Sequence, residues 1–182
     1  MNNNGTAVQL GTAQLAGYTF KDVMSMGDVY YQSGLFKDIR SAAQAIVKIM
    51  KGRELGIPPA SAMEIINVIE GKTALSGVAI AGIIKSSRKY RYDITSSTTR
   101  AATVEFFERI DGAWKSLGSA SFTEEDARRA GLAGKKNWRE YPQNMYLWRA
   151  LSNGGRMYCP DILAGVYTAE ELGVEEIGRA HV

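Results

Sequence analysis

The chain has 182 residues, of which 45% are hydrophobic and 23% charged, the proportions of a soluble globular protein that can bury a core. No apolar run is long enough to span a bilayer, no membrane partner is expected, and the single cysteine, Cys159, excludes an internal disulfide, so we expect a cytoplasmic protein. The net charge of +3 is uneven, because residues 1–160 carry 21 bases and 14 acids, which favours a polyanionic partner.

The two ends of the chain differ in composition from the rest. We expect a single domain over residues 1–176, in which residues 1–17, rich in Asn, Gly, Thr and Ala, form a flexible arm. The last six residues, IGRAHV, match the translation of a common sequencing-adapter read, so we expect residues 177–182 to be a non-native tail and the true C-terminus to be missing. His181, the only histidine, lies in this tail, which argues against Ser-His or Cys-His catalysis and against a zinc site with histidine ligands.

Two helices are predicted before the first prolines. The segment FKDVMSMGDVYYQSGLF, residues 20–36, is typical of a short helix. Residues 41–56 predict a second helix, with Ser41 as its N-cap and Gly56 at its end. One face of this second helix is apolar and consists of Ala42, Ile46, Ile49 and Met50. The pattern places Lys48 and Lys51 off that face.

The middle of the chain combines short strands with one apolar helix. Residues 63–76 predict two strands that turn at Glu70-Gly71, and residues 77–90 predict a helix whose apolar part packs while its basic end emerges. A meander of three strands is predicted to follow, over residues 91–98, 100–110 and 113–122.

The dipeptide Asp111-Gly112 is a strong signal for a two-residue turn between the last two of these strands. The resulting register places Ile110 opposite Ala113, Arg109 opposite Trp114, Glu108 opposite Lys115 and Phe106 opposite Leu117. Glu105 and Glu108 then point to opposite faces of their strand, while the turn itself explains Asp111. These three acids are therefore a poor candidate for the metal site of a nuclease, and no metal is expected.

Two helices and a loop are predicted after the meander. Residues 123–132 predict a short helix with Thr123 as N-cap, and residues 133–142 predict a basic loop that contains an aromatic residue. Pro142 is expected to begin the next helix, and the pair Gly154-Gly155 to fray its end. One face of that helix carries Tyr146, Arg149, Asn153 and Arg156.

The sequence contains no phosphate-binding loop, dinucleotide-binding motif or CxxC pair, so no cofactor is expected. Instead, bases alternate with aromatic residues in three segments, KSSRKYRYD, GKKNWRE and NMYLWR. Single-stranded nucleic acid needs this combination, because bases neutralise phosphates and aromatic faces stack on nucleobases. The alternative is that Trp138 and Trp148 belong to the core and that the bases only solvate the surface.

The order of these segments resembles the RecT/Redβ-like phage single-strand annealing proteins over residues 33–172. The most similar part is the helix that begins at Pro142, where the family has a methionine followed by basic residues seven positions apart, here Met145, Arg149 and Arg156. The resemblance implies that these two arginines hold the DNA backbone. It also implies an α+β fold, in which an antiparallel β-hairpin and a three-stranded β meander pack against helices and a basic groove binds DNA.

The resemblance further implies a recombination and repair protein that is not an enzyme and that anneals complementary single strands of DNA without ATP. It would act in the cytoplasm of the bacterial host, self-associate into a ring or helical filament, and work with a phage exonuclease and a host single-strand-binding protein. The predicted phosphate contacts are Lys72, Lys85, Arg88, Lys89, Arg91, Lys135, Lys136, Arg139, Arg149 and Arg156. The residues predicted to stack on bases are Tyr90 and Trp138.

Two other functions are compatible with the same sequence. One is an enzyme of DNA metabolism, such as a nuclease that lacks its C-terminal part, which would cleave labelled DNA in magnesium or manganese. The other is a structural phage protein with an incidental basic patch, which would bind heparin as readily as DNA.

Overall fold

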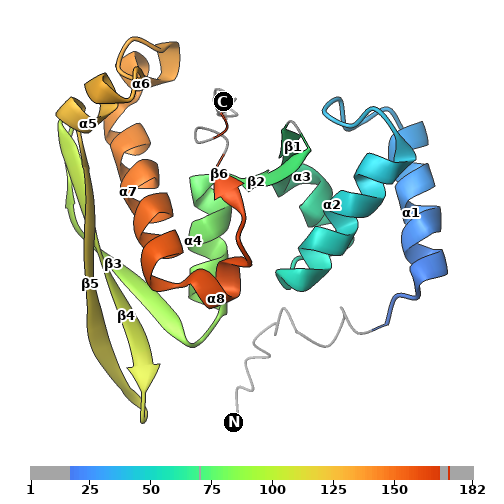
Figure 1. Cartoon of the computed structure of the whole chain (residues 1–182), viewed down its shortest axis with the longest axis horizontal. Helices are drawn as coiled ribbons and strands as arrows, with labels where there is room; N and C mark the ends of the chain where they lie inside the picture. Colours follow the sequence, from blue (N-terminus) through green and yellow to red (C-terminus); the bar gives the residue numbers. More distant parts are fainter. Residues whose placement is uncertain (1–16, 70, 169–171, 173–182) are drawn as a thin grey trace, which may run out of the picture. The chain divides into compact units, whose positions relative to one another are not determined.

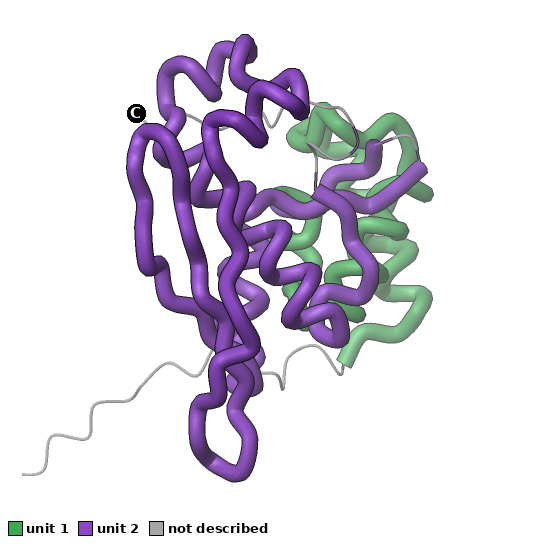
Figure 2. The backbone as a smooth tube through the Cα atoms, turned by 60° about the vertical axis from the view of Figure 1, so that its left-hand side comes forward, with its two compact units in different colours: residues 1–64 green, residues 65–182 purple. Residues whose placement is uncertain are grey.

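A computed structural model describes residues 17–69, 71–168 and 172, and over these residues the protein is α+β, with eight helices and two three-stranded sheets (Figure 1). The chain divides into two compact units, residues 1–64 and residues 65–182, which Figure 2 colours separately. The expected flexible arm, apart from Gly17, and the expected non-native tail with His181 lie outside the described residues.

Unit 1 is helical and contains both predicted helices. Helix α1 (Phe20–Gln32) begins with a capping box of Thr19 and Asp22, and α2 (Ala42–Glu54) begins at the predicted N-cap, where the Ser41 side chain accepts a hydrogen bond from the Gln44 amide. A third helix that the sequence did not predict, α3 (Pro59–Ile65), starts at the second of the two prolines that follow α2. The core of this unit consists of Val23, Ile39, Ala45, Ile49 and Met63.

The prediction that Lys48 lies off the buried face of its helix is wrong, because the Lys48 side chain is fully buried in unit 1. The Lys48 ammonium donates to a carboxylate oxygen of Asp38 and to the backbone carbonyl of Met63, both at 2.6 Å. Burial lowers the Lys48 pKa below its ordinary value, and the bond to Asp38 opposes that shift. Met50, expected on the apolar face, is instead exposed, so the buried stripe of α2 is rotated from the predicted one.

The smaller sheet of unit 2 is built on the predicted hairpin. Strands β1 (Ile66–Ile69) and β2 (Lys72–Leu75) are antiparallel, as expected, and Gly71 in the turn has the positive φ of 78° that favours glycine. A two-residue strand, β6 (Tyr167–Thr168), pairs with β2 in parallel and completes the order β1-β2-β6. No sequence signal predicted β6, because two residues are too few to show a periodic pattern.

Helix α4 (Gly77–Ser86) is shorter than predicted and ends before most of the basic residues. Its N-cap is Ser76, whose side chain accepts from the Ala79 amide, and its C-cap is Ser87. Arg88 follows in the left-handed conformation, with φ of 56°, and turns the chain into the next strand. Of the bases in KSSRKYRYD, only Lys85 therefore lies in the last turn of the helix.

The larger sheet is the predicted meander of β3 (Tyr90–Ser97), β4 (Ala101–Ile110) and β5 (Ala113–Thr123). Asp111 and Gly112 both have positive φ, as a two-residue hairpin turn of the primed type requires. The register is as predicted from Ile110 to Glu108, but a bulge between Phe106 and Phe107 places Phe106 opposite Gly118 instead of Leu117.

Helix α7 (Pro142–Tyr158) packs along one face of this meander, and no described helix or strand of unit 2 covers the other face (Figure 1). Pro142 begins the helix as predicted, but the glycine pair does not fray it, because Gly154 and Gly155 are buried and the helix continues for three further residues. The sheet contributes to this interface the buried side chains of Ala102, Val104, Phe106 and Phe122.

Three short helices lie near α7 in the sequence, two before it and one after it. Helix α5 (Glu124–Arg129) has the predicted N-cap Thr123 in a capping box with Asp126. Helix α6 (Lys136–Glu140) occupies the segment predicted as a basic loop, and α8 (Pro160–Leu163) follows the end of α7. Among the described residues, no helix combines the length and the apolar character that crossing a bilayer would take.

Candidate nucleic-acid interface

Three of the predicted phosphate contacts come together around strand β6. The Lys72 ammonium lies 5.1 Å from the centre of the Tyr167 ring, and the Arg156 guanidinium lies 5.6 Å from the same ring. The Arg149 guanidinium donates to the Thr168 hydroxyl at 3.1 Å. We call these five residues the β6 cluster; they join β2, α7 and β6, segments that are far apart in the sequence.

Regular structure determines the position of each base in the β6 cluster. Lys72 is the first residue of β2, and Tyr167 and Thr168 pair with the last two residues of that strand, Ala74 and Leu75. Arg149 and Arg156 are seven residues apart, two turns of α7, so they project from one side of the helix. Tyr167 is 37% exposed, so its ring presents an aromatic face at the surface beside the ammonium and guanidinium groups.

A second set of predicted contacts, the β3 group, lies between α4 and the start of β3 and comprises Lys85, Arg88, Lys89, Tyr90 and Arg91. The Lys89 ammonium is 2.7 Å from a carboxylate oxygen of Asp161 and 3.4 Å from one of Glu108. The bond to Asp161 is the largest cause of a raised Lys89 pKa. Two carboxylates already balance the charge of Lys89, so its ammonium is less available to an anion than the sequence suggested.

The aromatic residues of these segments are mostly inside the protein. Tyr90 is buried, which raises the pKa of its hydroxyl, and the Lys89 ammonium lies over its ring at 4.8 Å. Trp138 is also buried, with its ring 5.8 Å from Phe122 on one side and from Tyr146 on the other. In this conformation neither ring can stack on a base, so both are removed from the predicted stacking residues; for Trp138 the alternative of a core residue holds.

The third set of predicted contacts, the α6 group, comprises Lys135, Lys136 and Arg139. Lys136 lies 4.0 Å from Glu140, one turn further along α6. This group is next to the start of α7, whereas Lys89 is held by Asp161 in α8, beyond the end of α7 (Figure 1). A helix of 17 residues is about 25 Å long, so the β3 and α6 groups are at opposite ends of unit 2.

No family model, curated protein or solved structure matches this chain. The contacts of the predicted bases divide them into three groups, and over the described residues they do not place all of them along one groove.

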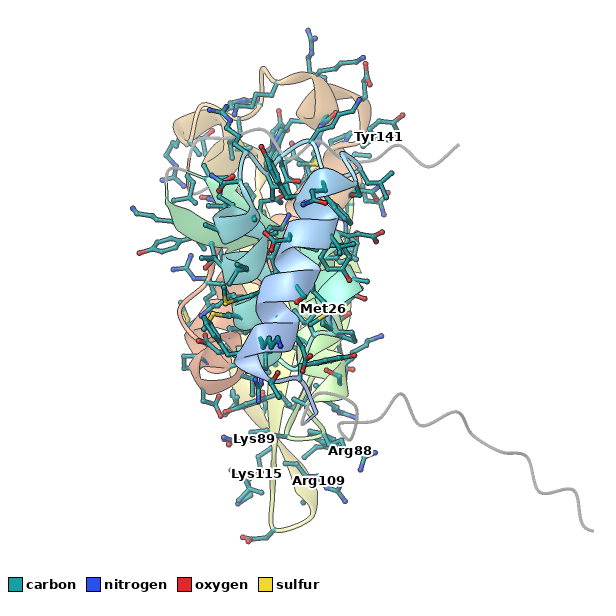
Figure 3. All side chains as sticks on the ribbon, turned by 90° about the vertical axis from the view of Figure 1, so that its right-hand side faces the viewer. Met26, Arg88, Lys89, Arg109, Lys115 and Tyr141 are labelled. Carbon is teal, nitrogen blue, oxygen red and sulfur yellow. The ribbon has the colours of Figure 1, made fainter. Side chains whose placement is uncertain are left out.

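Two bases and one aromatic residue near the β4–β5 turn were missed as site residues. Figure 3 shows Arg109 and Lys115 at the same end of the meander as Arg88 and Lys89. Arg88, Arg109 and Lys115 are exposed, and none of the three has an ion pair among the described residues. Trp114, opposite Arg109 in the register, is 39% exposed. The register itself could have drawn attention to the Arg109–Trp114 pair.

Two acids of β4 and the cysteine of unit 2 have structural explanations. The Ser116 hydroxyl donates to Glu105 at 2.6 Å, and Glu108 forms its ion pair with Lys89 although it faces Lys115 in the register, as predicted. Burial raises the pKa of Cys159 to about 12, so its thiol is protonated at neutral pH. Within the described part of the chain, no three His, Cys, Asp or Glu side chains come close enough to hold a metal ion.

Proposed function

We propose that this protein binds single-stranded DNA and anneals complementary strands without ATP, like the RecT/Redβ-like phage proteins that its sequence resembles. The observation that carries the proposal is the β6 cluster, in which bases from β2 and α7 converge on one partly exposed tyrosine. The proposed DNA-binding site is centred on this cluster, and the α6 and β3 groups, at opposite ends of unit 2, would be separate contacts.

The chemistry of the cluster suits a ligand recognised through its backbone. Guanidinium and ammonium groups bind phosphates of any sequence, and an aromatic face accepts any base. Binding phosphates from one side leaves the base edges available to a second strand, so base pairing itself supplies the free energy of annealing. Self-association into a ring or filament, and the exonuclease and host single-strand-binding partners, belong to the same proposal.

The direct test is strand annealing of two complementary labelled oligonucleotides by the full chain without ATP. The proposal expects faster annealing than in buffer alone, and intact oligonucleotides after incubation with magnesium or manganese. Cleavage of the DNA would support the nuclease alternative, and equal affinity for heparin and DNA without annealing would support the incidental basic patch.

The double substitution R149A/R156A is expected to weaken binding to a single-stranded oligonucleotide and to reduce its dependence on salt. Each lost phosphate contact removes about 0.7 from the slope of log affinity against log salt for single strands, so losing both contacts removes about 1.4. The measurement is fluorescence anisotropy over a series of salt concentrations.

Two further variants separate charge from structure at these positions. R149K/R156K keeps both charges and is expected to keep most of the slope. R128A/R129A removes two arginines whose ion pairs lie within α5 and is expected to leave the slope unchanged. An R149A/R156A protein with a normal circular dichroism spectrum and an unchanged slope would exclude both residues from the DNA-binding site.

A further inference from the structure

The face of the meander that points away from α7 carries a compact group of aromatic and basic side chains. In the register, Arg91 is opposite Phe107 and Arg109 is opposite Trp114. Phe107 and Arg109 are two residues apart on β4, and Phe106, the residue before Phe107, is buried on the α7 side, so all four side chains belong to the outer face. We call these four residues the outer platform.

Arg91 is held in place by the rings of the outer platform. Its guanidinium lies 4.5 Å from the centre of the Phe107 ring and 5.3 Å from that of Trp114, and 3.4 Å from a carboxylate oxygen of Asp93. The Arg91 Nε atom is buried and has no hydrogen-bond partner among the described residues. Contacts with two rings fix the orientation of the guanidinium, which lowers the entropy cost of binding an anion there.

Arg109 adds a second guanidinium beside the exposed indole. Its side chain is exposed and forms no ion pair within the described ranges, and its backbone amide donates to the carbonyl of Lys89. The remainder of this face carries hydroxyls, such as Thr103 bonded to Ser121, and two carboxylates, Asp93 near Arg91 and Glu105 bonded to Ser116. Trp114 and Arg109 lie beyond these acids, at the end of the sheet that carries the β4–β5 turn.

We infer that the outer platform binds one nucleotide of single-stranded nucleic acid, with the base stacked on Trp114 and its phosphate held by Arg109 and Arg91. Two guanidiniums beside an exposed indole are complementary to a base and its phosphate, which is the reason for preferring a nucleic-acid strand to a protein partner. The inference rests on the proposed function and extends it. Because α7 packs on the other face of the sheet, the platform would be a contact separate from the β6 cluster.

A photo-cross-link tests the location of the base directly. An oligothymidine containing 5-iodouracil is irradiated with the full chain, and the labelled peptides are identified by mass spectrometry. The expected result is a cross-link in the peptide that contains Trp114. A chain that binds the oligonucleotide but is labelled only on other peptides would overturn the assignment.

Substitutions give an independent readout of the same contact. W114A is expected to weaken affinity for a short oligothymidine about 5- to 150-fold, the usual cost of losing one stacked base, with the salt slope unchanged. R109A is expected to lower that slope by about 0.7. W114F keeps an aromatic ring for stacking and should lose less affinity than W114A, whereas a purely structural effect of Trp114 would not follow the presence of a ring.

R100A is the matched control for R109A, because Arg100 is an exposed arginine in the β3–β4 turn, at the opposite end of the meander. It is expected to change neither the affinity nor the slope. Wild-type affinity in both W114A and R109A, while R149A/R156A is weakened, would overturn this inference and leave the proposed function standing. If the unaltered chain does not bind the oligonucleotide, the proposed function fails and this inference fails with it.

Discussion

Replacing Lys48 by alanine is expected to lower the free energy of unfolding by about 3 kcal/mol, the lower end of the range found when one partner of a buried ion pair is removed. The Lys48 side chain is fully buried, so the substitution leaves a cavity where its stem packed. It also leaves the Met63 carbonyl, to which Lys48 donates at 2.6 Å, without this partner. Asp38 is 41% exposed, so water can solvate its carboxylate and the loss stays below the upper end of the range.

Urea denaturation followed by circular dichroism measures this difference. Lys48→Met keeps the length of the stem and is expected to lose less, about 1–2 kcal/mol, because only the polar contacts disappear. Lys21→Ala is the matched control, since Lys21 is an exposed lysine of α1 with no ion pair in the described part of the chain, and it should change stability by less than about 0.5 kcal/mol. Equal stabilities for the Lys48→Ala and Lys21→Ala proteins would show that the buried contacts contribute nothing.

The burial of Lys48 could not be predicted from the sequence. Features determined by neighbouring residues were predictable: the N-caps Ser41 and Thr123, and the turn at Asp111-Gly112. The buried contacts of Lys48 are made with Asp38 and with the carbonyl of Met63 in α3, fifteen residues away, and no helical period contains that information. A lysine on a predicted helix is assigned to the surface because most lysines are there.

The candidate site was predictable residue by residue but not as an arrangement. Lys72, Arg149 and Arg156 were predicted as phosphate contacts, yet the strand that brings them together, β6, has two residues and no sequence signal. All four bases of the segment KSSRKYRYD were predicted as phosphate contacts. Strand alternation and the turn at Arg88 divide them, with Lys89 bonded to Asp161 and Arg91 on the outer face of the meander.

The bulge in the meander is another feature of the arrangement that the sequence did not predict. Counting back from the turn gave the correct partners for Glu108 and Arg109 but placed Phe106 opposite Leu117. Gly118, with φ of 131°, accommodates the extra residue and faces Phe106 instead. This shift moves every later pair of β4 and β5 by one residue, which a turn signal alone cannot predict.

Gly154→Ala is expected to destabilise the protein by about 2–3 kcal/mol, although alanine favours a helix over glycine by about 1 kcal/mol. An added Cβ would lie 2.7 Å from the Ala120 side chain and closer still to the Phe106 ring, nearer than packed atoms approach. Phe106 is fully buried and packs against the ring of Tyr158 at 5.4 Å, so it has no space into which to move. The substitution must therefore push α7 away from the meander.

Gly82→Ala in α4 provides the opposite case, because nothing lies within 4 Å of the position that its Cβ would occupy. That protein is expected to gain about 0.5–1 kcal/mol, since alanine only reduces the freedom of the unfolded chain there. Thermal and urea unfolding of the two variants measure the contrast, and a gain in stability for both would mean that α7 does not pack closely on the sheet. Because Arg149 and Arg156 flank Gly154 on the same helix, a displaced α7 should also weaken DNA binding in Gly154→Ala and leave it unchanged in Gly82→Ala.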